Sequence, residues 1–211
     1  MRLLVGLGNP GPRHAKNRHN IGFMAADAIH RRHGFGPFRA KFDAALAEGT
    51  VAGERIFLLK PMTYMNLSGD AVLACAHFYK IGAGEIAVFH DELDLVDGKL
   101  RVKRGGGAAG HNGLRSIDAA IGPDYWRVRL GIGHPGAKEL VQPYVLQNFG
   151  ADEMGWVTPL IDAVAEALPL LVQDDAQGFM TKAALILNPP PPKPPRLTPP
   201  QDRESDTDNG I

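Results

Sequence analysis

A histidine and a distant aspartate are the residues of this 211-residue chain best suited to acid–base chemistry. His19 directly precedes residues 20–32, whose apolar spacing predicts a helix. Because the positive potential at a helix N-terminus disfavours imidazolium, we expect a neutral ring, the form a general base needs. Asp91 follows the apolar strand-like run 86–90, and its carboxylate could fix the tautomer of His19 and raise its basicity. A turn role for Asp91 is the alternative, and His90 ranks lower because it points to the opposite side of the strand.

Three asparagines occupy positions where a loop follows a strand or enters a helix: Asn9, Asn66 and Asn112. A side-chain amide both donates and accepts hydrogen bonds, which suits an amide or ester substrate. Turn formation and helix capping are the competing roles for loop asparagines.

The glycine pattern at residues 6–11 matches the G-x-G-x-x-G motif of dinucleotide-binding proteins. That motif requires a helix that opens directly from the glycines, whereas Pro10-Gly11-Pro12 forces an irregular turn. Asp27 also lies inside the predicted helix and not at the end of a second strand, where a ribose-binding acid belongs. The pattern therefore favours a tight loop that brings Asn9 to the carboxyl end of a strand, and we expect no cofactor.

Charge is unevenly distributed although the formal net charge is zero. Seven basic residues face only two acids within residues 99–129: Lys99, Arg101, Lys103, Arg104, Arg115, Arg127 and Arg129. A glycine-rich loop at 105–113 lies among them, and its amides could meet a phosphate. Such a basic face suits nucleic acid, with an ordinary solvated surface as the alternative. The acidic cluster Glu92 and Asp94 lacks His or Cys at ligand spacing, so we expect no metal.

The elements that must position these residues alternate along the chain. Strands are predicted at 2–7, 44–50, 55–60, 85–90, 99–103 and 126–131, the second and third as a hairpin around Ala52-Gly53. Helices are predicted at 20–32, 68–79, 110–121 and 152–172, with a short apolar segment at 181–187. Ser68 is the expected N-cap of its helix, and Pro169 should end or kink the last long helix. This order predicts an α/β fold in which helices flank a twisted mixed β-sheet.

Composition bounds the protein class and its domains. Hydrophobic residues make up 44% and charged residues 22% of the chain, which is typical of a globular protein. No run of about 18 apolar residues or signal segment is apparent, and Cys75 is the only cysteine, so we expect a cytoplasmic protein. Eight of the 17 prolines fall within 188–211. We therefore expect one domain at 1–187 and a disordered proline-rich tail, with a ligand for a partner domain as the alternative reading of the tail.

Six separated segments closely resemble bacterial peptidyl-tRNA hydrolases in order and spacing. They are residues 5–11 (VGLGNPG), 18–22 (RHNIG), 60–69 (KPMTYMNLSG), 90–94 (HDELD), 110–114 (GHNGL) and 129–136 (RLGIGHPG). The resemblance implies a monomeric α/β enzyme of the peptidyl-tRNA hydrolase-like, or phosphorylase/hydrolase-like, fold. It would cleave the ester between a peptide and the 3′ end of tRNA without a metal, a membrane or an obligate protein partner.

The resemblance also implies residue roles. His19 would be the catalytic base, Asp91 would stabilise its basic form, and Asn9 would help separate N-blocked peptidyl-tRNA from aminoacyl-tRNA. Further substrate contacts would come from Tyr64, Asn66 and Asn112, with Met65 packed under the catalytic ring and with Lys103 and Arg129 on the tRNA 5′-phosphate. Residues 134–149 correspond to the mobile loop and helix over the cleft.

This chain departs from the family pattern at three places. His14 stands where the family commonly has a substrate-contacting tyrosine, the glycine-rich loop carries Ala108-Ala109, and the proline-rich tail lies outside the pattern. A protein of the same fold that grips RNA without cleaving it remains the alternative function, although an intact His19 and Asp91 argue against it.

Overall fold

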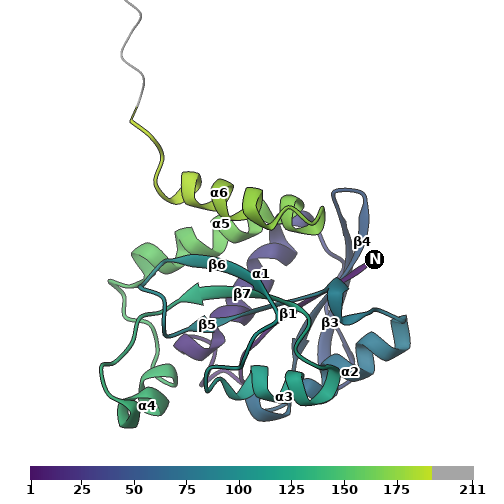
Figure 1. Ribbon diagram of the computed structural model, residues 1–211, viewed down its shortest axis with the longest axis horizontal. Coiled ribbons are helices and arrows are strands. Elements are labelled where there is room, and N and C mark those ends of the chain that lie inside the picture. The colour runs from purple at the N-terminus through teal and green to yellow at the C-terminus, as the bar shows by residue number, and fades with distance from the viewer. Residues whose placement is uncertain (192–211) are drawn as a thin grey trace, which may run out of the picture.

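Seven strands form one mixed sheet in the computed structural model, which describes residues 1–191 (Figure 1). The strands are β1 (Arg2–Gly6), β2 (Arg39–Lys41), β3 (Ala44–Val51), β4 (Glu54–Pro61), β5 (Ile86–Glu92), β6 (Leu100–Arg104) and β7 (Trp126–Gly131). Their order in the sheet is β2-β3-β4-β1-β5-β7-β6. The four central strands run parallel, while β2, β3 and β6 pair antiparallel at the edges. The predicted α/β fold with a mixed sheet is confirmed.

Helices cover both faces of this sheet (Figure 1). They are α1 (Ile21–His33), α2 (Ser68–Tyr79), α3 (Asn112–Ile121), α4 (Val141–Val145), α5 (Met154–Val172) and α6 (Ala176–Leu187). Helices α1, α5 and α6 lie on one face, and α2 and α3 lie on the other. In the central strand β1, Leu4 packs toward the first group while Leu3 and Val5 pack toward the second. Burial on both faces explains why β1 is continuously apolar instead of alternating.

Most predicted elements are found within one to three residues of their expected bounds. The hairpin around Ala52-Gly53 is confirmed, since Val51 of β3 pairs with Glu54 of β4. The prediction of Ser68 as an N-cap is wrong, because Ser68 is the first residue of α2 and its hydroxyl donates to the carbonyl of Met65. The short strand β2 was not predicted, whereas the five-residue α4 lies within residues 134–149, where the family resemblance implies a helix.

Of the two effects expected of Pro169, an end or a kink of the helix, the end is excluded, since α5 continues to Val172. A proline inside a helix leaves the carbonyl four residues earlier without its usual donor. That carbonyl belongs to Ala165, and it accepts a hydrogen bond from Nε2 of His33 at 2.7 Å. Because His33 of α1 supplies the missing donor, the helix can continue past the proline without an unpaired carbonyl at Ala165.

Helix α5 is long and apolar enough to cross a membrane by length and composition alone. It packs instead against α1 and α6, and side chains such as Val157, Leu160, Val164 and Leu168 are fully buried. It is a core helix. The tail predicted for 188–211 lies outside the described residues from 192 onward, so the proposed division into a domain and a tail stays a prediction.

One edge of the sheet gathers the carboxyl ends of β4, β1 and β5, where ligands bind in open α/β sheets. Helix α1 reaches this edge because Gly22 has no side chain. A Cβ at Gly22 would lie 2.3 Å from the carbonyl oxygen of Phe89 and 2.5 Å from the amide nitrogen of Leu7. This close approach puts the turn before α1 directly above the strand ends.

Candidate active site

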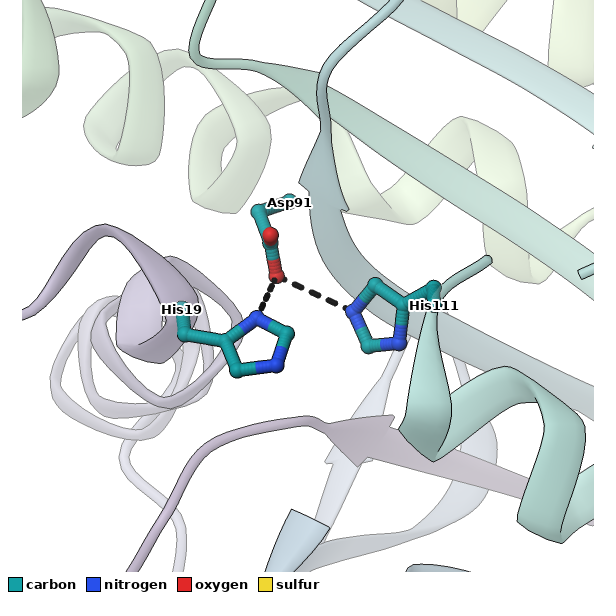
Figure 2. A group of neighbouring side chains, drawn as sticks. All are labelled: His19, Asp91 and His111. Carbon is teal, nitrogen blue, oxygen red and sulfur yellow. Dashed lines mark hydrogen bonds and ion pairs between the residues drawn. The ribbon is translucent and has the colours of Figure 1, made fainter. Parts of the chain in front are cut away.

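His19 lies in the 3₁₀ turn η1 (Arg18–Asn20), which leads into α1. Its Nδ1 lies 2.8 Å from Oδ1 of Asp91 in β5, as Figure 2 shows. Burial lowers the pKa of His19, but attraction to the Asp91 carboxylate and the hydrogen bond to it together raise that pKa above its ordinary value. Asp91 therefore raises the basicity of His19 in the direction that the sequence predicts, and its effect outweighs that of burial.

A second histidine, His111, binds the same carboxylate oxygen (Figure 2). Its Nε2 lies 3.0 Å from Oδ1 of Asp91, while its Nδ1 accepts hydrogen bonds from the backbone amides of Gly113 and Leu114. His111 is thus the N-cap of α3. A ring nitrogen that accepts from backbone amides carries no proton, so Nε2 holds the proton and donates it to Asp91.

The protonation pattern of the cluster follows from these contacts. Asp91 is deeply buried, and burial alone would raise its pKa, but its attraction to His19 and His111 and the hydrogen bonds from both hold the pKa well below its ordinary value. An ionised Oδ1 accepts from both rings, so neutral His19 carries its proton on Nδ1. The lone pair of His19 then sits on Nε2, the nitrogen that points away from Asp91.

His90 precedes Asp91 but is a different kind of residue. It is 1% exposed, and its Nδ1 donates to the carbonyl of Asp91 at 2.7 Å. Burial, with a contribution from His111, lowers the pKa of His90 to about 3, so this ring is neutral over the working range. The structure offers no exposed nitrogen on His90 for a reacting group.

One potential ligand atom from each of His19, Asp91 and His111 lies within 4.8 Å of the other two, a spacing that a metal ion could use. The hydrogen bonds argue against this use. A metal on Nε2 of His111 would require that nitrogen to lose its proton, yet Nδ1 already receives two backbone donors. The residues present do not fit a metal centre.

Asn9 follows β1 and faces the same site with a defined orientation. Its Oδ1 accepts from the amide of Met65 at 2.9 Å. The side chain of Asn20 holds its backbone at both ends, accepting from the Asn9 amide at 3.0 Å and donating to the Asn9 carbonyl at 2.9 Å. Because Oδ1 is already used, Nδ2 of Asn9 is the atom free to meet a ligand, and it can only donate.

These groups line a cavity of about 1380 Å³. The predicted site residues along it are Asn9, His19, Tyr64, Met65, Asn66, Asp91 and Asn112. Tyr64 is 68% exposed at its rim, whereas Met65 is 4% exposed inside. The segment around α4 also lines the cavity, including Val141 and Val145.

Comparison with known proteins identifies the family. The peptidyl-tRNA hydrolase family model matches residues 3–190. The chain belongs to this family. Peptidyl-tRNA hydrolase of Granulibacter bethesdensis is 60% identical over 185 residues, which are 87% of this chain and 95% of that protein. The corresponding protein of Rhodospirillum centenum is 56% identical over 190 residues, covering 90% and 84%.

A solved structure supports the same assignment. The crystal structure of peptidyl-tRNA hydrolase from Acinetobacter baumannii is 40% identical and matches with a TM-score of 0.82 over 87% of this chain and 94% of that one. The family resemblance and the expectation of a peptidyl-tRNA hydrolase enzyme are confirmed.

Three of the predicted substrate-binding residues of this peptidyl-tRNA hydrolase do not line the cavity: His14, Lys103 and Arg129. Nδ1 of His14 lies 2.9 Å from Oδ1 of Asn17, so the His14 ring bonds within the loop that precedes η1. Lys103 and Arg129 lie on the paired strands β6 and β7, where their register gives them the same face of the sheet. Arg129 also contacts Glu92, which is one of the residues that line the cavity.

Sequence reasoning missed two residues of the peptidyl-tRNA hydrolase site. His111 stands in one of the matching segments, but histidine is an uncommon N-cap and nothing in the spacing ties it to Asp91. Glu92 was weighed as a metal ligand, but its Oε2 accepts from Nε of Arg129 at 2.7 Å. The sequence signal for Glu92 is its place directly after Asp91, which puts a second carboxylate at the end of the same strand.

Proposed function

We propose that this chain hydrolyses the ester between the peptide and the tRNA 3′ end, with His19 as the general base. The observation that carries the proposal is the orientation of this ring. Nδ1 donates to a buried carboxylate, which leaves the basic Nε2 directed away from Asp91 in a residue that lines the cavity.

The reaction proceeds in two steps. Nε2 of His19 takes a proton from water while the water oxygen forms a bond to the ester carbonyl carbon. The bond between this carbon and the ribose oxygen then breaks, and the proton passes from Nε2 to that oxygen to give a free ribose hydroxyl. Asp91 stabilises the transient imidazolium, in keeping with the raised pKa of His19.

Asn9 supports this chemistry as a donor. Its Nδ2 could stabilise the oxyanion or bind the amide carbonyl of an N-blocked substrate, and Asn112, which also lines the cavity, offers a second amide. A free aminoacyl-tRNA presents an ammonium group, which is itself a donor and cannot bond to Nδ2. Discrimination against aminoacyl-tRNA follows from this mismatch.

The tRNA body would bind beside the cavity through phosphate contacts at Lys103 and Arg129. Such contacts carry little sequence information, so many tRNAs should serve as substrates. Glu92 holds Nε of Arg129 and leaves its two terminal nitrogens to meet a phosphate. We place this activity in the cytoplasm and expect a monomer.

The deciding experiment is hydrolysis of N-acetyl-aminoacyl-tRNA by the wild type and by His19→Ala. Removal of a general base should lower turnover by at least about 100-fold. The control is His77→Ala, which removes an exposed histidine of α2 and should keep full activity. Near-normal turnover by His19→Ala would rule out the proposed base, and binding of tRNA without hydrolysis by the wild type would favour the RNA-gripping alternative.

A further inference from the structure

Four consecutive residues before α1 are buried, and their side chains bond to three separate parts of the chain. Asn17 donates to Oδ1 of Asn148, Arg18 binds the carbonyl of Asn148 and the side chain of Glu153, His19 binds Asp91, and Asn20 binds the backbone of Asn9. The turn that carries the proposed base is thus also tied to the segment that follows α4. Arg18 is the charged member of this set, and the proposed mechanism does not use it.

Arg18 is 8% exposed and is enclosed by the 144–153 segment. Its Nη2 lies 2.6 Å from Oε2 of Glu153, and its Nη1 donates to the carbonyl of Asn148 at 3.1 Å. Its guanidinium carbon lies 4.4 Å from the ring centroid of Tyr144 and 5.4 Å from that of Phe149. A planar guanidinium suits such stacking together with directed hydrogen bonds, and an ammonium group does not reproduce both.

Backbone hydrogen bonds also join the residues before His19 to the segment that follows α4. The amide of Arg18 donates to the carbonyl of Gln147 at 3.0 Å, and the amide of Phe149 donates to the carbonyl of Lys16 at 2.9 Å. Between them Asn17 and Asn148 form an isolated antiparallel bridge. The chain that leaves α4 is therefore paired with the residues directly before His19.

We propose that Arg18 is a positioning residue that holds α4 at a set distance from His19 and so determines the width of the cavity. Val141 and Val145 of α4 and the adjacent Leu146 line the cavity, and the same segment also contributes the polar side chains His134, Lys138 and Gln142. The three apolar side chains suit those of the peptide part of the substrate. Loosening Arg18 should weaken binding of this part without altering the His19–Asp91 contact.

The first test is independent of catalysis and measures amide hydrogen exchange in the free protein. In Arg18→Lys, exchange at residues 141–149 should rise about tenfold, the effect of losing one charge-assisted hydrogen bond, while amides of β1 remain unchanged. Glu153→Gln removes the same ion pair by changing its more exposed partner, and it should give the same increase in exchange at residues 141–149. The matched control is Arg32→Lys, which alters an exposed Arg–Glu pair between α1 and α5 and should leave residues 141–149 unaffected.

The second test is kinetic and rests on the proposed function. With N-acetyl-aminoacyl-tRNA, Arg18→Lys should raise KM about tenfold, leave kcat within about twofold and keep the acid limb of the pH profile in place. Unchanged exchange at 141–149 in both Arg18→Lys and Glu153→Gln would overturn the proposal whatever the enzyme hydrolyses. A fall in kcat at constant KM, or a displaced acid limb, would show that Arg18 acts on His19 itself and would overturn it as well.

Discussion

Replacing Asp91 with asparagine separates the charge of this carboxylate from its geometry. Both histidines bond to the same atom, Oδ1 of Asp91. His111 can only donate from Nε2, because the start of α3 occupies its other nitrogen. The new amide should therefore turn its oxygen toward both rings, since the opposite orientation would place two donors against each other. His19 keeps its proton on Nδ1, and the base loses only the negative charge behind it.

The expected loss of turnover lies between two limits. Exchanging a charge-assisted hydrogen bond for a neutral one costs about 1 kcal/mol, or about fivefold in rate. The upper limit comes from the Coulomb energy of the pair, whose contacting atoms are 2.8 Å apart. With charge centres about 4 Å apart and an effective dielectric of about 20, that energy is about 4 kcal/mol, or about 10³-fold. We expect a loss near the middle of this range, about 10²-fold.

The assay is kcat for N-acetyl-aminoacyl-tRNA hydrolysis across pH, for the wild type, Asp91→Asn and Asp91→Ala. The acid limb of Asp91→Asn should move to lower pH, because the carboxylate that raises the pKa of His19 is gone while burial, which lowers it, remains. Asp91→Ala should be the slower variant, since neither ring then has an acceptor and His19 can take the wrong tautomer. An unmoved acid limb, or equal activity of the two variants, would refute this account of Asp91.

Four further outcomes follow from the same geometry. His111→Asn should keep the cap of α3 and the melting temperature yet lower kcat about fivefold, whereas His111→Ala should also lose about 1 kcal/mol of stability in thermal unfolding. Asn9→Asp replaces a donor with an acceptor and should reduce the preference for N-acetyl-aminoacyl-tRNA over aminoacyl-tRNA at least about tenfold in paired assays. Lys103→Ala should weaken tRNA binding and reduce its salt slope by about 1, and a change in turnover alone would contradict the phosphate role. The pKa of Asp91 is lower in the folded protein than in the unfolded chain, so its contribution to stability is complete above the unfolded pKa. Free energies of unfolding measured across pH should show this contribution being lost as the pH falls through the pKa of Asp91 in the folded protein.

The regular elements could be predicted because their signals are local. Apolar runs, the Ala52-Gly53 turn and helical spacing each depend on residues within one segment, and all of these predictions place the element correctly. The failures depend on distant partners. Helix α5 passes Pro169 with help from His33, which lies far away in sequence, and no local rule for proline contains that partner. Strand β2 has only three residues, too few to form a pattern, and exists because β3 offers an edge.

The candidate site shows the same division. The ends of parallel strands can be predicted to meet, so the pairing of His19 with Asp91 followed from their places after β1 and within β5. The charge state of His19 could not be predicted in this way, because two opposing effects act on the ring and their balance depends on a contact of 2.8 Å. The role of His111 was hidden for a related reason: one nitrogen is used locally, as a cap, and the other across the fold. A residue with both a local and a distant bond gives a sequence signal for the local one only. Such residues are where a structure adds most to the reading of an active site.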